Sequence, residues 1–235
     1  RVLQVASMFG LGVEDEHAVT LVPPTTLTLA AGQVVFITGA SGSGKSSILK
    51  LIDDALASHD EANVIRFDAI PDPLDRPLVD AFDTLWPEAD LSDVLRVLSL
   101  AGLNDAFVML RKPSQLSDGQ RYRLRLAQTF AQIAAHDTDA LHVVLADEFG
   151  ATLDRITAKV IARNVRKWTR RHATSPGVCF VAATTHDDLL EPLEPDVLIE
   201  KRLGAGMEVF RRGSEERSFG FDAEARRRGG GMWEE

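Results

Sequence analysis

The sequence contains little cysteine and no long apolar run, and both shortages exclude common classes of protein. Its 235 residues include one cysteine, Cys179, so an internal disulfide and a cysteine-rich metal site are excluded. The longest apolar runs, "VVFI", "LHVVLA" and "VCFVAA", have the length of strands and fall short of the roughly 18 residues of a membrane helix. A basic-then-apolar leader is also missing. We therefore expect a cytoplasmic protein with no transmembrane segment of its own, and the initial Arg1 predicts trimming or a longer parent chain.

The sequence also lacks an excess of positive charge, since its formal net charge is −9. This argues against a generally basic surface that coats nucleic acid, although a local basic face is compatible with it. Residues 155–171 have the pattern of such a face on a helix, opposite an apolar stripe of Ile156, Val160, Ile161, Val165 and Trp168. The residues expected to contact nucleic acid are Arg163, Arg166, Lys167, Arg170 and Arg171. The alternative is an ordinary solvated helix face, which has the same pattern.

Short apolar segments alternate with helix-like segments along the chain, which predicts an α/β fold with a largely parallel sheet flanked by helices. Residues 25–39 resemble two strands joined at Ala31 and Gly32, which predicts an N-terminal antiparallel β section. A helical section is expected over residues 74–120, with helices in "LVDAFDTLW" and "LSDVLRVLSLAGL". We expect one domain over residues 1–210, and a charged, Gly-rich tail over residues 211–235 that is too poor in apolar residues to fold alone.

The stretch "FITGASGSGKSSILKLI", residues 36–52, reads as a strand, a Gly-rich turn and a helix. It contains the pattern G-x-x-x-x-G-K-[ST], in which backbone N–H groups and a helix N-terminus surround a polyphosphate. The Lys45 ammonium would reach the β and γ oxygens, and the Ser46 hydroxyl would bind Mg²⁺. A flexible Gly/Ser turn is the alternative, which the strand–turn–helix context disfavours. The predicted ATP ligands are Gly39, Ser41, Gly42, Ser43, Gly44, Lys45, Ser46 and Ser47.

A second candidate element is the strand-like segment "LHVVLADE", which ends in Asp147 and Glu148. Ligands of α/β proteins bind at the carboxyl ends of parallel strands, where these carboxylates would meet the phosphate turn. We expect Asp147 to hold Mg²⁺ together with Ser46, and Glu148 to polarise the attacking water. Many strands end in acidic residues, so this prediction depends on the pairing with the phosphate turn.

The segment "QLSDGQRYRLRLAQTF" resembles the signature motif of the ATP-binding-cassette (ABC) ATPase superfamily, L-S-G-G-Q at the start of a helix. Ser117, Gly119 and Gln120 match the motif, whereas Asp118 replaces its first glycine. In that family the motif contacts the γ-phosphate bound by a second subunit. The resemblance therefore implies a P-loop NTPase that forms a homodimer on binding ATP. An ordinary N-cap followed by a turn is the alternative explanation of Ser-Asp-Gly-Gln.

Other motifs of the family follow in family order over roughly residues 1–210. "ATLD" resembles the D-loop with Asp154, and "ATTHDD" resembles the switch region, which implies that His186 acts with Glu148 and Lys45 in catalysis. The Q-loop glutamine is missing, and Asp72 occupies its place as a candidate Mg²⁺ contact through water. Phe9 is the candidate for stacking on the adenine.

The departures from the family pattern favour a stand-alone ABC ATPase, because the glutamine is missing and the interval from Lys45 to Ser117 is short. The wording of "RPLVDAF" and "LSDGQRYRLRLA" is similar to soluble ABC ATPases that in some proteins are fused to a predicted acetyltransferase domain. The predicted function is hydrolysis of ATP in a soluble switch or motor that acts on a nucleic acid or protein client. An ATPase subunit of a membrane transporter is the alternative, and a small-molecule kinase is a third, disfavoured because kinases have no use for the signature and D-loop motifs.

Overall fold

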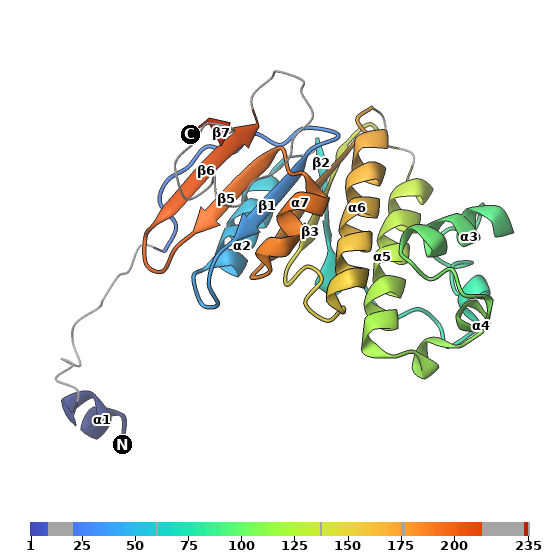
Figure 1. Ribbon diagram of the computed structural model, residues 1–235, viewed down its shortest axis with the longest axis horizontal. Helices are drawn as coiled ribbons and strands as arrows, with labels where there is room; N and C mark the ends of the chain where they lie inside the picture. The colour runs from blue at the N-terminus through green and yellow to red at the C-terminus, as the bar shows by residue number, and fades with distance from the viewer. Residues whose placement is uncertain (9–20, 60, 137, 175–176, 213–232, 235) are drawn as a thin grey trace.

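The computed structural model describes residues 1–8, 21–59, 61–136, 138–174, 177–212 and 233–234. A seven-stranded sheet runs through these residues in the order β2-β3-β4-β1-β5-β6-β7 (Figure 1). The first five strands in this order are parallel. At the β5 edge of the sheet, β6 pairs antiparallel with β5, and β7 pairs antiparallel with β6. This confirms the predicted α/β fold. The strands are β1 Val34–Thr38, β2 Ala62–Arg66, β3 Leu141–Ala146, β4 Val178–Thr184, β5 Val197–Lys201, β6 Met207–Arg212 and β7 Trp233–Glu234.

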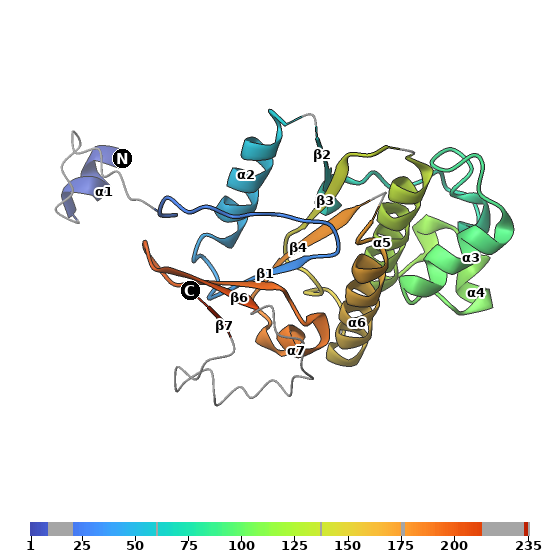
Figure 2. The same ribbon diagram turned by 90° about the horizontal axis from the view of Figure 1, so that it is seen from above.

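Helices cover both faces of the sheet, with α2 on one face and α5, α6 and α7 on the other (Figure 2). Successive residues of a strand point to opposite faces, so Phe36 packs in the core under α5 and α6, whereas Val35 and Ile37 pack against α2. No helix in the described ranges has the length and apolarity needed to cross a membrane. The helices are α1 Val2–Met8, α2 Lys45–Leu56, α3 Leu91–Leu100, α4 Ala106–Met109, α5 Asp118–Ala135, α6 Arg155–Arg171 and α7 Leu190–Leu193.

The antiparallel β section predicted near the N-terminus is not found in residues 21–33, which form no strand. Two consecutive prolines, Pro23 and Pro24, have no N–H to donate to a ladder. The Ala30 N–H donates instead to the Gln33 side-chain oxygen, at 3.0 Å. Antiparallel pairing occurs at the other end of the described chain, where β6 pairs with β5 and β7 pairs with β6.

The predicted domain boundary at residue 210 falls inside a strand. β6 continues to Arg212, and Arg211 pairs with Val197 of β5. The first two residues of the expected tail therefore belong to the sheet. Residues 213–232 lie outside the described part of the chain.

The predicted helical section contains α3, α4 and several turns, and one expected helix is not regular. Of "LVDAFDTLW", residues 78–86, only Leu78–Asp80 form a single 3₁₀ turn, and further turns follow. Pro77 precedes this segment, and the Leu78 N–H donates out of it, to the Arg111 carbonyl at 3.0 Å. The helix-like spacing of its apolar residues therefore reflects turns packed against the core.

A buried histidine lies at the start of β3, where the sheet meets the end of α5. His142 is fully buried, and the Asn63 side-chain amide lies 3.1 Å from its Nδ1. The amide is a donor, so Nδ1 accepts and the proton of the neutral ring lies on Nε2. Burial lowers the pKa of His142 from its ordinary value of 6.5, and charges on His136 and His172 lower it further.

We expect His142 to make the stability of the fold depend on pH. Its pKa is lower in the folded chain, so the unfolded chain takes up the proton more readily, and the free energy of unfolding falls as the pH drops below about 6.5. Urea unfolding at about pH 7.5 and pH 5.5 should show a smaller difference for His142→Gln than for the wild-type chain. The exposed His59 offers a control, since His59→Gln should keep the wild-type difference. An unchanged difference in His142→Gln would contradict the prediction.

Candidate functional site

The phosphate turn joins the end of β1 to the start of α2, as the sequence predicts. Three of its glycines have positive φ angles: +148° at Gly39, +73° at Gly42 and +102° at Gly44. A Cβ atom at Gly39 would lie 2.0 Å from the Lys201 carbonyl oxygen, so only glycine fits there. The backbone at Gly42 is open, because a Cβ atom added there would have nothing within 4 Å. The turn therefore leaves backbone free to approach a ligand closely.

The side chains of Ser43 and Lys45, which belong to the phosphate turn and the start of α2, are buried. The Lys45 ammonium donates to the carbonyls of Gly39, at 2.9 Å, and Ala40, at 2.8 Å. Burial lowers the pKa of Lys45, whereas the negative charges of Asp147, Glu148 and Asp187 raise it. The Ser43 hydroxyl is buried and has no hydrogen-bond partner in the described residues. A polyphosphate in the turn would supply acceptors for both side chains.

A cavity of about 550 Å³ opens between the phosphate turn and the ends of β3 and β4. It brings together the turn and both carboxylates, as predicted, and adds Leu21, Ala151, Thr184 and Thr185, which sequence reasoning missed. Thr184 ends the buried strand β4 and Thr185 follows it, so their place at a strand end in "ATTHDD" is the signal that could have identified them. The full lining is Leu21, Ser41, Gly42, Gly44, Lys45, Ser46, Ser47, Asp147, Glu148, Ala151, Thr184 and Thr185.

The donors in this cavity fit Mg²⁺ held jointly with a nucleotide. Ser46 and Asp147 both line it, and hydroxyl and carboxylate oxygens are the ligands that Mg²⁺ prefers. Among the described residues, no group of three or more His, Cys, Asp or Glu side chains could hold a metal by itself. Mg²⁺ is usually bound through one or two protein groups together with substrate phosphates and water.

The backbone at Glu148 is strained. Glu148 has a φ angle of +47°, a left-handed conformation that is rare outside glycine, and its N–H donates to Asp147 Oδ1 at 2.9 Å. Such strain persists only where the surroundings enforce it, and it is concentrated at functional sites. One enforcing contact comes from α5, because the buried Tyr122 hydroxyl accepts from the Gly150 N–H at 2.9 Å. Burial raises the pKa of Tyr122, so the phenol stays neutral.

The signature segment forms the N-terminus of α5, away from this cavity. Ser117 and Gln120 make a capping box, with Gln120 N donating to Ser117 Oγ at 3.3 Å and Ser117 N to Gln120 Oε1 at 3.1 Å. This is the cap that the alternative explanation predicts, but the hydroxyl still has its own proton to donate. Ser117, Gly119 and Gln120 are not among the described residues that line the cavity. One chain thus has two separate candidate cradles for phosphate.

Among the described residues, the two arginines that follow the signature donate to backbone carbonyls and form no ion pair with Asp118. The Arg121 guanidinium donates to the Leu116 carbonyl at 3.1 Å. The Arg123 guanidinium donates to the carbonyls of Gly119, at 3.2 Å, and Gly102, at 2.8 Å. Asp118 is exposed beside the signature, so its negative charge stays close to the second candidate cradle.

Asp154 and His186 flank the same region without lining the cavity among the described residues. Asp154 caps α6 by accepting from Thr157 N at 2.9 Å. Hydrogen bonds from the Thr157 side chain and then from its backbone lower the pKa of Asp154. His186 is half-buried, two residues past the end of β4, and its N–H donates to Thr184 Oγ1 at 3.3 Å.

The structure does not bring Asp72 into the site. Its side chain is 62% exposed and lies 4.0 Å from Arg125, and it is absent from the described lining of the cavity. The buried Gln128 of α5 donates to the Pro71 carbonyl at 3.1 Å and so fixes this loop, a role that sequence reasoning missed. Phe9, the candidate for adenine stacking, lies outside the described residues.

The fold and the cavity together define a P-loop protein that binds nucleoside triphosphates at the carboxyl end of a parallel sheet. The profile of the ABC transporter family matches residues 22–136. The lipoprotein-releasing system ATP-binding protein LolD of Maricaulis maris is 30% identical over 192 residues, which cover 70% of this chain and 79% of that protein. LolD of Bordetella pertussis is 29% identical over 208 residues, or 74% and 82% of the two chains. The chain belongs to the ABC transporter ATPase family, whose members bind ATP with Mg²⁺ and hydrolyse it.

Solved structures show the same fold. The dimeric structure of MJ0796, a bacterial ABC transporter cassette, has a TM-score of 0.56 and 21% identity, and the match covers 82% of this chain and 92% of that chain. A post-hydrolysis state of the same cassette, bound to ADP and Pi, also matches with a TM-score of 0.56 and 21% identity, over 83% and 92% of the two chains. At this identity the likeness concerns the fold.

Proposed function

We propose that this chain is the ATP-binding and hydrolysing subunit of a membrane transporter, acting as an ATP-dependent head-to-tail pair on the cytoplasmic side of a separate membrane chain. The cavity that joins Lys45 and Ser46 to Asp147 and Glu148 is the observation that supports ATP chemistry. The transporter assignment is supported by the relatives, which are named as ATP-binding proteins of a lipoprotein-releasing system. Neither the kinase alternative nor the soluble motor has such support. The finer resemblance, to ATPases fused to an acetyltransferase domain, stays a prediction.

In this proposal the residues of the cavity divide the chemistry among them. Lys45 and the turn amides would bind the β- and γ-phosphates, and Ser46 and Asp147 would hold Mg²⁺, which would neutralise phosphate charge. Glu148 orients and polarises the attacking water, because its carboxylate lies at the cavity beside the turn. His186, two residues past the end of β4, would contact the γ-phosphate.

Head-to-tail pairing follows from the separation of the two cradles. A γ-phosphate in the first cradle would present its outward oxygens to a second copy of the chain, whose Ser117 hydroxyl and Gly119 N–H are donors at a helix N-terminus. Gly119 lies against the loop before α6, with a Cβ position 3.5 Å from Leu153. The signature and the Asp154 segment would therefore enter the same interface.

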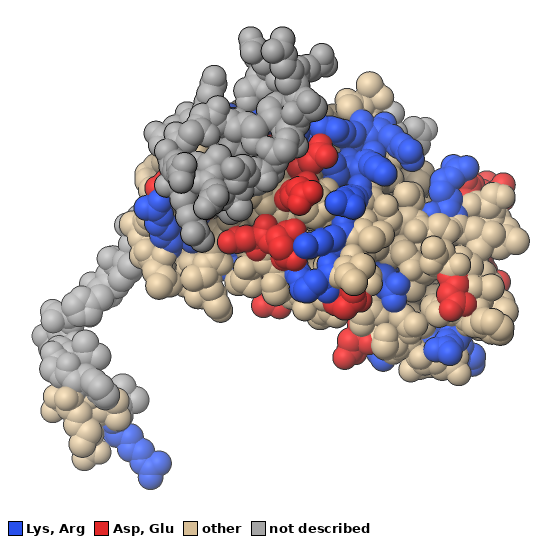
Figure 3. Space-filling model, viewed as in Figure 1, with Lys and Arg blue, Asp and Glu red and all other residues tan. Residues whose placement is uncertain are grey.

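A nucleic acid client is not supported by the charge on α6. Arg166 is 4% exposed and pairs with Asp196, so it cannot contact nucleic acid. Ile156 and Val160, which were predicted to belong to the apolar stripe of the helix, are exposed. The other three residues of the predicted stripe, Ile161, Val165 and Trp168, are buried. Carboxylates of the α7 region lie beside the basic residues, and Figure 3 shows the two charges side by side on this face. The pairs are Arg155 and Lys159 with Asp188, Arg163 with Glu191, and Arg170 with Glu194.

The helical section carries exposed apolar side chains that suit a membrane partner. Phe107, Leu110 and Leu74 are 80%, 66% and 56% exposed. The segments that carry them are joined, since Leu78 N donates to the Arg111 carbonyl and Ser114 N donates to Asp75 Oδ1 at 3.1 Å. Phe107 in α4 and Leu110 at its C-terminal end lie three residues apart, and exposed apolar patches of this kind mark protein interfaces.

We expect the double variant Phe107→Ser, Leu110→Ser to lose its membrane partner and keep its nucleotide. The wild-type chain should co-purify from detergent-solubilised membranes of its native cell with a chain that has membrane-spanning helices, identified by mass spectrometry. The double variant should recover at least about tenfold less of it, since hydrophobic hot spots carry most of an interface's energy. Leu203→Ser, on the β5–β6 turn and 69% exposed, is the matched control. Recovery of no membrane chain by the wild type, or equal recovery by the double variant, would contradict the proposal.

A further inference from the structure

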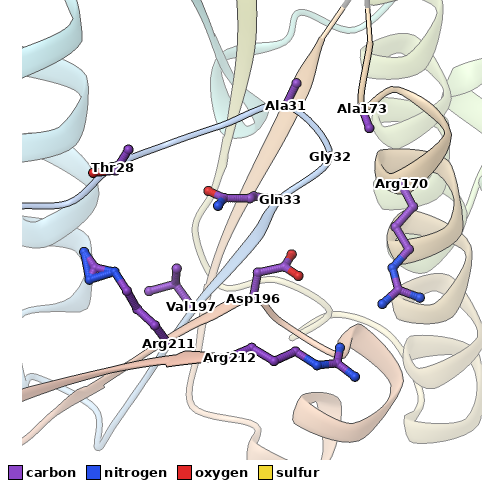
Figure 4. Close-up of a pocket in the computed structure, with 10 residues that line it drawn as sticks. All are labelled: Thr28, Ala31, Gly32, Gln33, Arg170, Ala173, Asp196, Val197, Arg211 and Arg212. Carbon is purple, nitrogen blue, oxygen red and sulfur yellow. The ribbon is translucent and has the colours of Figure 1, made fainter. Parts of the chain in front are cut away.

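The Glu148 side chain lines the ATP cavity and is exposed, and among the residues that the structure describes no hydrogen bond or ion pair holds its carboxylate. Asp196, which lies beside the start of β1 (Figure 4), is held quite differently. Both of its oxygens accept from the Arg166 guanidinium, and Oδ2 also accepts from Val34 N at 2.8 Å. The direction of the Glu148 side chain is therefore set by the backbone that carries it.

That backbone is a turn that is tied both to the sheet and to a helix. Phe149 N donates to the Ala183 carbonyl of β4 at 2.9 Å, and Gly150 N donates to the Tyr122 hydroxyl of α5, also at 2.9 Å. Phe149 and Gly150 are both buried, so neither N–H has water as an alternative acceptor. The first contact joins two backbone groups, whereas the second depends on one side-chain hydroxyl that a substitution can remove.

The Tyr122 ring is fixed by aromatic packing, so its hydroxyl is a rigid acceptor. The ring centroid lies 4.9 Å from that of Phe67 and 6.4 Å from that of Phe149, which in turn lies 5.5 Å from that of Phe180 in β4. Phe149 is fully buried and follows Glu148 directly in the chain. Replacing the tyrosine by phenylalanine keeps these ring contacts and removes only the hydroxyl.

We propose that Tyr122 is a positioning residue for ATP hydrolysis, which acts through the Gly150 N–H to hold the Glu148 carboxylate in place. The φ angle of +47° at Glu148 persists only while surrounding contacts enforce it. Without the hydroxyl, the buried Gly150 N–H loses its acceptor and the turn relaxes. A displacement of about 1 Å is enough to impair a catalytic group severely. The inference rests on the proposed role of Glu148 in polarising the attacking water.

Tyr122→Phe should lower kcat for ATP hydrolysis at least about tenfold, because it misplaces the carboxylate. The dissociation constant of a non-hydrolysable Mg-ATP analogue should stay at the wild-type value, because the phosphate turn and Lys45 are unchanged. Steady-state hydrolysis and calorimetric titration measure the two quantities on one preparation, and binding of the analogue verifies that the variant is folded. A hydroxyl with a structural role alone would alter stability and leave kcat as it is.

Thr129→Val is the matched control. Thr129 lies on the same helix and is buried as well, and its hydroxyl donates to the Arg125 carbonyl of that helix at 3.0 Å. The substitution therefore also removes a buried hydroxyl and its hydrogen bond, without touching the turn that carries Glu148. Its kcat should equal that of the wild type.

A double variant tests whether Tyr122 acts through Glu148. In Glu148→Gln no base remains to be positioned, so adding Tyr122→Phe should lower the residual hydrolysis by less than about twofold. The proposal is overturned if folded Tyr122→Phe keeps the wild-type kcat, or if the two substitutions lower kcat independently of each other. Wild-type hydrolysis by Glu148→Gln would overturn the proposed role of Glu148 and this inference with it.

Discussion

The variant Glu148→Gln should bind Mg-ATP as the wild type does and hydrolyse it about 10²- to 10⁴-fold more slowly, the usual contribution of a general base. The phosphate turn and Lys45 bind the nucleotide, whereas the carboxylate acts only on the water. Both side chains have the same shape, so the strained φ angle of +47° is kept and folding should be unaffected. Phosphate release and nucleotide binding, measured on the same preparation, separate the two effects. Undiminished hydrolysis would remove Glu148 from its proposed role.

The same variant should form a two-fold pair with Mg-ATP and remain a monomer with Mg-ADP. Only ATP offers a γ-phosphate whose outward oxygens the signature of a second copy can bind. Sedimentation at saturating nucleotide measures this directly. The exposed Asp118 adds negative charge at that signature, so we expect the pair to be weak and sensitive to salt. A monomer with both nucleotides would contradict head-to-tail pairing while leaving the ATPase assignment intact.

Ser117→Asp provides a sharp control in the Glu148→Gln background. Asp caps a helix as well as Ser does, so the capping box with Gln120 and the fold of α5 are preserved. A carboxylate at this position repels the γ-phosphate of the facing chain, and the ATP-dependent pair should be lost. Pairing that survives this change would mean that Ser117 is only a helix cap.

The phosphate turn, the acidic pair and the parallel sheet were all predictable from sequence because their signals are local. A buried strand such as β4 has no polar residue before Thr184, and the Gly39 to Ser46 spacing permits few other structures. The carboxyl ends of parallel strands meet at one edge, so the sequence also predicts that Asp147 and Glu148 lie near the turn.

Features that depend on distant segments were not predictable. The basic residues of α6 have the same sequence pattern whether or not carboxylates pair with them. The carboxylates that pair with them come from the α7 region, as in the pair of Arg163 and Glu191. The sequence pattern places Arg166 with the exposed basic residues of the helix. In the fold it is buried, because it pairs with Asp196, which lies beside β1. The strand expected in residues 25–30 has the right alternation, yet these residues form no strand, because a strand exists only where a partner supplies a ladder.

The last residues of β6 show the same limit. Arg211 and Arg212 read as the first residues of a charged tail, whereas the structure places them in β6 beside the end of α6. Antiparallel pairing with β5 carries Arg212 to Asp196, to whose carbonyl its N–H donates at 2.9 Å. The composition of the segment does not predict this contact between Arg212 and Asp196.

Among the described glycines, Gly39 should be the one where an added methyl group does the most damage, as in Gly39→Ala. A Cβ there meets the Lys201 carbonyl oxygen at 2.0 Å, and the backbone at φ +148° disfavours any side chain, so β1 and β5 must move apart. Strain and overpacking together should lower the free energy of unfolding by about 2–5 kcal/mol, a fall in melting temperature of several degrees, and ATP binding should be lost with the shape of the turn.

Two other glycines separate steric overlap from backbone strain. Gly204→Ala, in the β5–β6 turn, has a φ of +73° and nothing within 4 Å of its Cβ, so it should cost only about 1–2 kcal/mol and leave ATP affinity unchanged. Gly42→Ala has the same φ and the same open space but lies in the phosphate turn. It should match Gly204→Ala in thermal unfolding and differ from it in ATP affinity, because its methyl group occupies space where the ligand approaches. If Gly39→Ala were no less stable than Gly204→Ala, the close contact between the phosphate turn and Lys201 would not hold the site together.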